Sequence, residues 1–366
     1  MADVGQGQFL EAPKTGLKRI RIGVVGTGWW STAVHMPALA TDPRVELVAV
    51  VDTDQARARS AADQFGVASV FRDLDSMVAT VPVHGVIIAT PHHTHAELAS
   101  RALEAGISAL VEKPLATTSV DAWALVEAER RSAGTLVAGL TYQFAACAPF
   151  VREAVQERIG EVVSINAEFS SNTERLFSSP EDNSSDPGVA HGATYSDPST
   201  GGGQGYTQLS HLLGGMLWAL GDQATQVHAF MHNRSARVDI VDALSIRLAG
   251  GALAVASSTG TTAANVPVRH RIRFHGTAGM LEWDLLGAEA WLYQSDGYAR
   301  HVENPSNRAP YASREVASTF ARVIAGEVPN PAPAGAAAAG VALIEAAYSS
   351  AATQQRVEVV QGELSR

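Results

Sequence analysis

The sequence lacks a second cysteine and any long, strongly apolar run. Cys147 is the only cysteine among 366 residues, so no intrachain disulfide can form and the fold does not require an oxidising compartment. The longest apolar stretch, residues 331–352, is mostly alanine and contains Glu345, which favours a soluble helix over a membrane span. Residues 1–17 hold no basic start followed by an apolar core. We therefore expect no signal peptide and a cytoplasmic protein without membrane contact.

Positive charge is also scarce. The chain has 27 lysines and arginines against 37 aspartates and glutamates, which gives a net charge of −10. Such a surface repels phosphate backbones, so nucleic acid is not expected as a partner. The apolar share of 46% over this length supplies enough material for two packed domains.

The pattern of apolar and helical segments differs between two parts of the chain. Residues 18–141 alternate short apolar runs with helical segments, a pattern typical of a parallel sheet covered by helices on both faces. Residues 142–366 contain several extended runs in succession, which predicts a large antiparallel sheet. We therefore predict an N-terminal tail at 1–17, an α/β domain at 18–141 and a second α/β domain at 142–366. The polar tract at 171–200 is too long for a simple connection, and we interpret it as a substrate lid, with a subunit-contact arm as the alternative.

A glycine turn after the first apolar run predicts a nucleotide site. Gly26, Thr27 and Gly28 follow the strand-like residues 20–25, and Ser31 takes the third small position. Glycine is needed there because the chain turns tightly and its backbone approaches a pyrophosphate at a helix N-terminus.

An acidic residue follows at the spacing expected for a ribose contact. Asp52 ends the next apolar run, 24 residues after Gly28. A carboxylate at this place hydrogen-bonds the adenosine ribose and repels a 2′-phosphate, so NAD is favoured over NADP. Arg57 and Arg59 lie one turn further on, and their positive charge moderates this preference.

Two ionisable side chains occupy positions suited to chemistry. Lys113 follows Glu112 in the motif VEKPLA, at the end of a predicted parallel strand, where open sheets bind ligands. His211 lies on a predicted helix that begins after a glycine triplet and has an apolar opposite face. Thr207 is one turn earlier, so in a regular helix both side chains would point the same way.

These motifs occur in an order that resembles one family. They are GVVGTG, VAVVD, IIATPHHTH, VEKPLA, the glycine triplet before a helix with a histidine, FHGTAGMLEW and EAAYSSAA. Because the set spans nearly the whole chain, the sequence resembles the Gfo/Idh/MocA family, named for glucose–fructose oxidoreductase, inositol dehydrogenase and a rhizopine-catabolism protein. The resemblance implies an N-terminal Rossmann domain and a C-terminal α/β domain with a large open antiparallel sheet. It also implies hydride transfer between a nicotinamide and a secondary alcohol of a sugar, sugar acid or cyclitol, with Lys113 and His211 flanking the reacting hydroxyl.

The chemistry of the two side chains fits that reaction. A neutral imidazole can take the hydroxyl proton near neutral pH, and an ammonium group can stabilise the developing alkoxide. A lysine whose pKa is lowered by desolvation could instead be the base. The sequence leaves the roles of Lys113 and His211 open.

Two departures from the family pattern bear on substrate and mechanism. Many relatives carry an aspartate four residues before the histidine, where this chain has Thr207. The histidine then acts either without a carboxylate or with one from elsewhere, such as Asp197 or Glu168. The arginines that relatives often carry after the aromatic–amide pair, here Tyr142 and Gln143, are missing. We therefore expect a neutral polyol or glycoside rather than a phosphorylated or strongly acidic substrate.

The predicted site consists of a catalytic pair, a cofactor set and a substrate set. The catalytic pair is Lys113 and His211. The predicted cofactor contacts are Gly26, Thr27, Gly28, Trp29, Trp30, Asp52, Thr90, Pro91, His92, His95, Glu112, Lys113 and Gln143. The predicted substrate contacts are Thr207, Tyr142, Asp197, Tyr206 and Gln143. Three imidazoles within the PHHTHAE motif rarely converge on one ion, so no metal site is predicted.

The leading interpretation is an NAD-dependent dehydrogenase or reductase acting on CH–OH groups of a neutral sugar, glycoside or cyclitol. One alternative keeps the fold but uses bound NAD as a recycling oxidant, cleaving a glycoside by oxidation, elimination and re-reduction. Another is a non-catalytic relative that senses dinucleotide or sugar, against which the presence of Lys113 and His211 argues. An open antiparallel sheet exposes apolar surface, so we expect a homo-oligomer, either a dimer or a tetramer.

Overall fold

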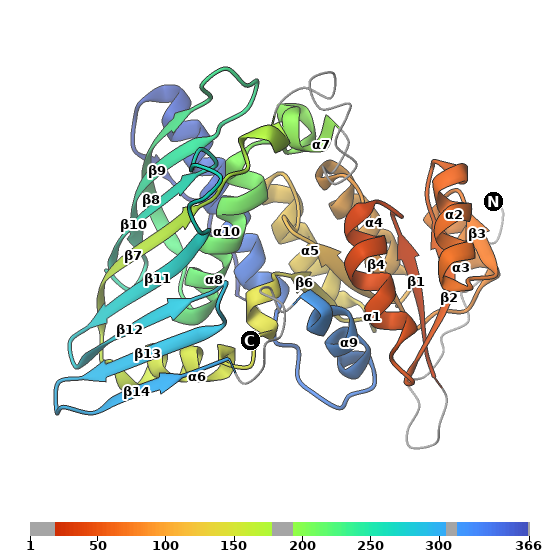
Figure 1. The fold of residues 1–366 in the computed structure, drawn as a ribbon, viewed down its shortest axis with the longest axis horizontal. Helices are drawn as coiled ribbons and strands as arrows, with labels where there is room; N and C mark the ends of the chain where they lie inside the picture. Colours follow the sequence, from red (N-terminus) through yellow and green to blue (C-terminus); the bar gives the residue numbers. More distant parts are fainter. Residues whose placement is uncertain (1–18, 178–192, 305–312, 365–366) are drawn as a thin grey trace. The chain divides into compact units, whose positions relative to one another are not determined.

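The computed structural model describes residues 19–177, 193–304 and 313–364 (Figure 1). These residues divide into two compact units. The first contains residues 19–112, 124–139 and 313–333, and the second contains the remaining described residues. The chain therefore enters the second unit at Leu140, and it also passes between the units at Lys113, Ala124, Ser313 and Ala334. Half of the predicted lid at 171–200, residues 178–192, lies outside the described residues.

The first unit is built on a parallel sheet of six strands in the order β3-β2-β1-β4-β5-β6. The strands are β1 (Ile20–Val25), β2 (Val45–Val51), β3 (Ser69–Phe71), β4 (Gly85–Ile88), β5 (Ser108–Glu112) and β6 (Leu136–Gly139). The central strands are apolar and buried along almost their whole length, as expected when helices cover both faces. The order reverses between β1 and β4, which is where open α/β sheets bind ligands. This confirms the predicted Rossmann-type sheet.

The helical segments of the first unit have clear local stop and start signals. They are η1 (Ser31–His35), α1 (Met36–Ala40), α2 (Gln55–Phe65), α3 (Leu74–Thr80), η2 (His92–Thr94), α4 (His95–Glu104), most of α5 (Ser119–Arg131) and α9 (Ser313–Ile324). Asp54 caps α2 by accepting from two backbone amides, and Gly66 ends it with φ 69°. Helix α9 joins this unit because Phe320 and Ile324 pack over Gly85 of β4, where a Cβ atom would leave no room for them.

The second unit is built on a nine-stranded sheet in the order β14-β13-β12-β11-β7-β10-β9-β8-β15. The strands are β7 (Val162–Ser170), β8 (Ala224–His232), β9 (Val241–Leu248), β10 (Leu253–Thr259), β11 (Arg269–Gly276), β12 (Gly279–Asp284), β13 (Glu289–Gln294), β14 (Ala299–Val302) and β15 (Val357–Glu358). All pairings are antiparallel except β7 with β10. The predicted antiparallel sheet is therefore confirmed, with one parallel pairing added.

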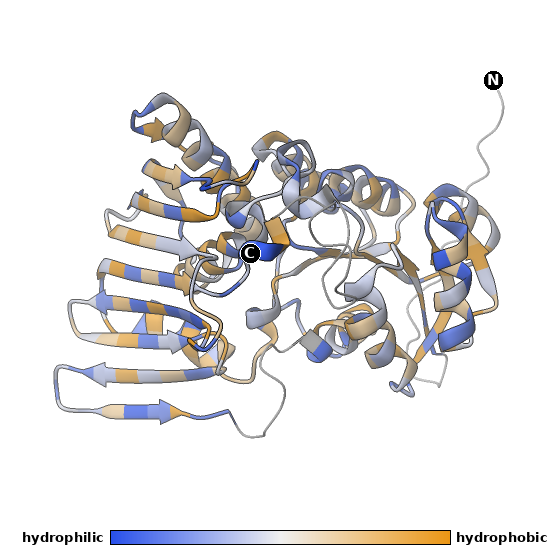
Figure 2. Cartoon of the chain, turned by 45° about the horizontal axis from the view of Figure 1, so that its top comes forward, coloured by the Kyte–Doolittle hydropathy of each residue, from blue (hydrophilic) through white to orange (hydrophobic). Residues whose placement is uncertain are grey.

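Helices cover one face of this sheet and leave its other face to solvent. Helices α8 (Ser210–Leu220) and α10 (Ala334–Thr353) pack on the sheet and on each other, and both are almost entirely buried (Figure 1). The shorter segments are η3 (Thr141–Phe144), α6 (Ala148–Glu153), η4 (Ala154–Arg158), η5 (Glu174–Phe177), α7 (Ala193–Ser196), η6 (Pro198–Thr200) and η7 (Gly205–Leu209). Buried and exposed residues alternate along β9, β10 and β11, and hydrophobic and hydrophilic bands alternate along these strands in Figure 2. Alternate residues along a strand thus face the core and the solvent.

Candidate active site

The glycine turn after β1 has the geometry of a pyrophosphate-binding turn. Gly26 adopts φ +89°, and a Cβ atom there would lie 2.5 Å from the carbonyl oxygen of Ala89. Gly28 differs, because a Cβ atom on it would meet nothing within 4 Å. The tight turn explains Gly26, and the open space beside Gly28 is a cradle that a side chain would fill. This part of the first unit fits a dinucleotide.

Asp52, at the end of β2, holds the glycine turn in place. Its carboxylate accepts from the backbone amide and hydroxyl of Thr27 at 2.9 and 2.8 Å. Arg57 donates to the same carboxylate at 2.8 and 3.1 Å. Burial raises the pKa of Asp52, but the hydrogen bonds from Arg57, Thr27 and Asp54 outweigh it and leave the pKa below its usual value. The predicted ribose carboxylate is thus paired with a half-exposed arginine, which supplies positive charge at the ribose end of the site.

Side chains of the loop after β4 make contacts within the loop itself. His95 is buried, and its Nε2 lies 2.9 Å from the carbonyl oxygen of Thr90. Thr90 also shares a 2.7 Å hydroxyl contact with Thr94, and the ring of His92 lies 5.8 Å from that of His95. His95 therefore has a structural contact of its own, and Pro91 is exposed at the loop surface. Among the described residues, no three His, Cys, Asp or Glu side chains are placed to hold a metal ion.

Glu112, at the end of β5, organises a small network in the first unit. Its Oε1 accepts from the indole nitrogen of Trp30 at 2.8 Å and lies 2.8 Å from Nε2 of buried His35. The indole of Trp30 is thus held by a carboxylate, whereas Trp29 keeps about half of its surface exposed. Sequence reasoning missed His35, whose only signal was an ionisable side chain on the apolar segment that follows the glycine turn.

Lys113 opens the second unit and reaches the segment that carries His211. The Lys113–Pro114 peptide bond is cis, and Nζ of Lys113 donates to the backbone carbonyl of Thr207 at 2.8 Å. Thr207 lies in η7, a π-helical turn that directly precedes α8. Its hydroxyl donates to the carbonyl of Gly203 at 2.6 Å. The structure therefore brings Lys113 and Thr207 together through the backbone rather than through the threonine side chain.

The π-turn also changes the geometry expected of this helix. The prediction that Thr207 and His211 point the same way assumed regular α-helical spacing. The segment from Gly205 to Leu209 instead hydrogen-bonds to the fifth residue rather than the fourth, and the shared direction of Thr207 and His211 stays a prediction.

His211 is held neutral in the core of the second unit. Its side chain is only 5% exposed. Burial is the largest cause that lowers its pKa well below 6.5, and the charge of Lys113 lowers it further. A histidine of this kind is uncharged at neutral pH and can accept a proton.

Tyr142 and His270 complete a cluster of rings around His211. The hydroxyl of Tyr142 lies 2.7 Å from Nδ1 of His270, and both side chains are buried. The ring of Tyr142 lies 5.4 Å from that of His211. Sequence reasoning missed His270, although the alternation RHRIRF places it on the same face of β11 as the buried Ile272 and Phe274.

The remaining predicted substrate contacts are Gln143, Tyr206 and Asp197, and the last two make contacts within the protein. Gln143 is buried, and both atoms of its amide have no hydrogen-bond partner among the described residues, as expected of a group that awaits a polar ligand. Tyr206 instead donates to the carbonyl of Thr117 at 2.7 Å and stacks on Tyr348. Asp197 accepts from the backbone amide of Ser199 at 2.9 Å and caps η6.

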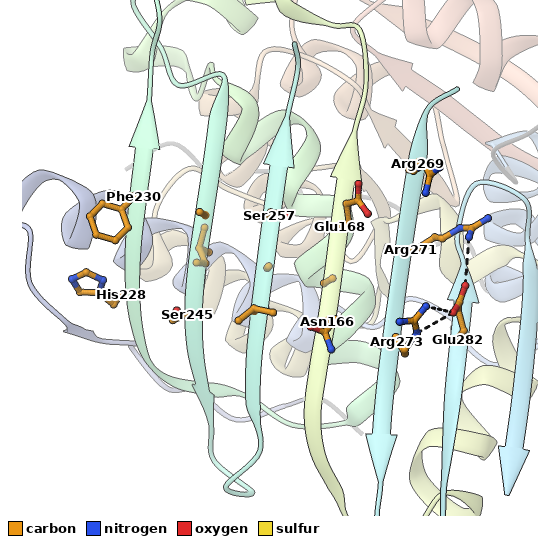
Figure 3. A pocket seen from close by; sticks show the side chains of 15 residues that line it. Asn166, Glu168, His228, Phe230, Ser245, Ser257, Arg269, Arg271, Arg273 and Glu282 are labelled. Atoms are coloured by element: carbon orange, nitrogen blue, oxygen red, sulfur yellow. Dashed lines mark hydrogen bonds and ion pairs between the residues drawn. The ribbon is translucent and has the colours of Figure 1, made fainter. Parts of the chain in front are cut away.

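The prediction that Glu168 supplies a carboxylate to His211 is wrong. Its neighbour Phe169 faces the core, so strand alternation places Glu168 on the solvent face of β7. It lines a shallow hollow of about 500 Å³ on the outward face of the nine-stranded sheet (Figure 3). Arg271 and Arg273 form ion pairs with Glu282 in the same hollow.

The six-stranded sheet with its glycine turn and buried acid defines a dinucleotide-binding domain of the Rossmann class. Comparison with known families agrees along most of the chain. Residues 20–140 match the GFO/IDH/MocA oxidoreductase family model, described as an NAD-binding Rossmann fold, and residues 150–282 match the GFO/IDH/MocA C-terminal domain. The chain belongs to this family of NAD-binding oxidoreductases.

Individual relatives match over shorter stretches. A 1-carboxy-3-chloro-3,4-dihydroxycyclohexa-1,5-diene dehydrogenase of Comamonas testosteroni is 38% identical over 125 residues, 34% of this chain and 31% of that one. An inositol 2-dehydrogenase 1 of Saccharopolyspora erythraea is 40% identical over 112 residues, 30% of this chain and 33% of that one. The chain thus spans about a third of the length of these curated relatives. A levoglucosan dehydrogenase solved with NADH shares the fold, with a TM-score of 0.79 at 21% identity, over 94% of this chain and all of that one.

Among the described residues, no helix is long and apolar enough to cross a membrane.

Proposed function

We propose that the chain is an NAD-dependent dehydrogenase that oxidises a secondary hydroxyl of a neutral sugar, glycoside or cyclitol. The observation that carries the proposal is the pairing, within the second unit, of a buried neutral His211 with the positive charge of Lys113. Removal of hydride from an alcohol also requires removal of the hydroxyl proton, and a neutral imidazole is the group that accepts it.

The proposed roles of the two side chains follow from their surroundings. His211 takes the hydroxyl proton in this proposal, because burial and the neighbouring ammonium leave its imidazole unprotonated at neutral pH. The ammonium of Lys113, oriented by the Thr207 carbonyl, donates to the substrate oxygen and stabilises the negative charge that develops there.

The first unit holds the cofactor in this proposal. The turn from Gly26 to Gly28 binds the pyrophosphate, and Asp52 with Arg57 faces the adenosine ribose. NAD, when bound, supplies the nicotinamide that accepts hydride. NAD remains favoured over NADP because of the Asp52 carboxylate, and Arg57 limits that preference.

The proposed substrate is neutral and polyhydroxylated. Residues 144–148, which follow Gln143, carry no charged side chain that would pair with a phosphate or carboxylate. The amide of Gln143 offers both a donor and an acceptor, which suits a hydroxyl group. The names of relatives support the same class, since inositol 2-dehydrogenase and D-glucoside 3-dehydrogenase are among them.

The test is a panel of cyclitols, free sugars and glycosides scored by NADH formation. Lys113→Ala and His211→Ala should each lower turnover by at least about a hundredfold while NAD binding is retained. Glu168→Gln, which removes a carboxylate from the outward face, is the matched control and should match the wild type. Unchanged turnover in both Ala variants would refute the assignment. Release of free sugar or aglycone without NADH would point instead to the NAD-recycling cleavage reaction.

We further propose that the outward face of the nine-stranded sheet is covered by a second copy of the chain. Phe230, Leu253 and Val255 on this face are more than half exposed. Apolar side chains gathered on one sheet face favour association, and a symmetric dimer would bury both copies of the face. Light scattering should show a dimer or tetramer for the wild type and smaller particles for Phe230→Asp combined with Val255→Asp.

A further inference from the structure

Three rings from separate elements of the second unit form one buried cluster. Tyr142 comes from η3, His211 from α8 and His270 from β11. The ring centroids lie 5.4 Å apart for Tyr142 and His211, 4.5 Å for Tyr142 and His270, and 6.3 Å for His211 and His270. The planes meet nearly edge to face, which is the arrangement that aromatic rings prefer. The orientation of His211 is therefore set partly by Tyr142.

A hydrogen bond fixes Tyr142 in turn. Its hydroxyl and Nδ1 of His270 are 2.7 Å apart. Burial lowers the pKa of His270 to about 3, so this imidazole stays neutral and keeps one donor and one acceptor nitrogen. Its second nitrogen, Nε2, has no hydrogen-bond partner among the described residues. The hydrogen bond to Tyr142 is thus the polar contact that the structure shows for this buried ring.

His270 rests on a rigid part of the sheet. It pairs with Phe169 across the β7–β11 ladder, and the two rings pack at 4.6 Å with an angle of 80°. Both strands lie in the interior of the nine-stranded sheet, so their backbones are hydrogen-bonded on both sides. The His270 ring, held by these strands, can therefore fix the position of Tyr142 in the more irregular η3 segment.

The side chains considered from sequence as helpers for His211 are used elsewhere. The hydroxyl of Thr207 donates to Gly203, Asp197 caps η6, and Glu168 faces solvent. The ring cluster bears directly on the orientation of His211.

We propose that His270 is a positioning residue, which acts through Tyr142 to hold His211 in the orientation that takes the substrate proton. The inference rests on the proposed dehydrogenase function. Misplacing a catalytic group by about 1 Å can cost a factor of about 100 in rate. Loss of the Tyr142–His270 hydrogen bond should therefore lower kcat by about ten- to a hundredfold and leave KM for the sugar within about threefold.

The first experiment is a kinetic comparison of His270→Phe, Tyr142→Phe and the double variant. Each single variant removes one side of the hydrogen bond and keeps a ring of similar volume. If the pair acts as a unit, the double variant loses no more kcat than the single variants do. His270→Asn, whose amide oxygen can stand in for Nδ1, should restore most of the kcat that His270→Phe loses. Equal kcat in the wild type and His270→Phe, or additive losses in the double variant, would overturn the inference.

A control and a second readout separate this inference from folding and from the proposed function. His275→Phe replaces another histidine of β11, whose position in the strand alternation places it on the opposite face from His270. This variant should leave kcat unchanged. The second readout is the imidazole ¹⁵N spectrum of the apoprotein, with His211 assigned from His211→Ala. The signals of His211 should shift in His270→Phe and Tyr142→Phe but not in His275→Phe, whether or not a substrate is turned over. A wild type without turnover would refute the proposed function, whereas unshifted His211 signals would refute the positioning role.

Discussion

The ammonium nitrogen of Lys113 lies 2.8 Å from the backbone carbonyl oxygen of Thr207, in the π-turn that leads into the helix carrying His211. The contact joins the loop after β5 to a segment 94 residues later in the chain. It also places a positive charge where it lowers the pKa of His211. One interaction thus orients the lysine and tunes the histidine.

Removing this charge should raise the pKa of His211. In Lys113→Met the electrostatic cause disappears and burial remains, so the pKa should rise but stay below 6.5. His211 would then keep its proton to a higher pH than in the wild type. Titration of the His211 imidazole by NMR measures the shift. Arg271→Met removes a positive charge from the outward face and should leave the titration of His211 unchanged, and a Lys113→Met curve that overlays the wild type would contradict the prediction.

Arg57 should influence the choice between NAD and NADP. It donates twice to Asp52 and offers positive charge to a 2′-phosphate, so Arg57→Ala should raise the ratio of kcat/KM for NAD over NADP by about tenfold. Asp52→Ala should lower the ratio, because the repulsion of the phosphate is lost. Arg59→Ala, an exposed arginine two residues further along α2, is the matched control. A ratio that responds equally to Arg57→Ala and Arg59→Ala would count against a specific role for Arg57.

Asp242 should make the protein less stable as the pH rises. The carboxyl group is 1% exposed, no donor among the described residues reaches it, and burial and the charge of Asp239 raise its pKa well above 3.8. The folded state therefore holds a proton that the unfolded chain releases above about pH 4. Stability is fully present below that pH and falls, by up to about 1.4 kcal/mol per pH unit, until the folded-state pKa is passed.

Asp242→Asn removes this dependence while keeping the shape of the side chain. The free energy of unfolding of Asp242→Asn in urea should be higher than that of the wild type. The difference between the two proteins should be larger at pH 8 than at pH 5. Asp63→Asn, at an exposed position of α2, should show no such pH-dependent difference. A constant difference between Asp242→Asn and the wild type across this range would show that Asp242 is ionised in the folded protein.

Cys147 should be unreactive in the native protein. It is 1% exposed, and burial raises the pKa of its thiol to about 11, so little thiolate forms at neutral pH. Ellman's reagent should label no thiol in the folded protein and one per chain in denaturant. Rapid labelling of the native protein would indicate that the region around α6 opens readily.

The sequence by itself determined the two sheets and the nucleotide turn, because each depends on short-range patterns. Continuous apolar runs predicted the buried parallel strands, and Gly26 predicted a tight turn in which a side chain would clash. Successive extended runs predicted the second sheet. Alternation along β11 also placed His270 in the core in principle, but nothing local showed which ring it would meet.

Tertiary structure alone decided how the candidate site is assembled. Tyr142 and His270 are 128 residues apart, and their contact follows from how β11 pairs with β7 under α8. Helix α9 packs on the first unit although it follows strands β7 to β14 of the second. The π-turn of η7, whose hydrogen bonds are shifted by one residue, was likewise not evident from the local sequence pattern. Residue types and periodicity fix secondary structure, whereas side-chain partners depend on long-range packing and on such local changes of register.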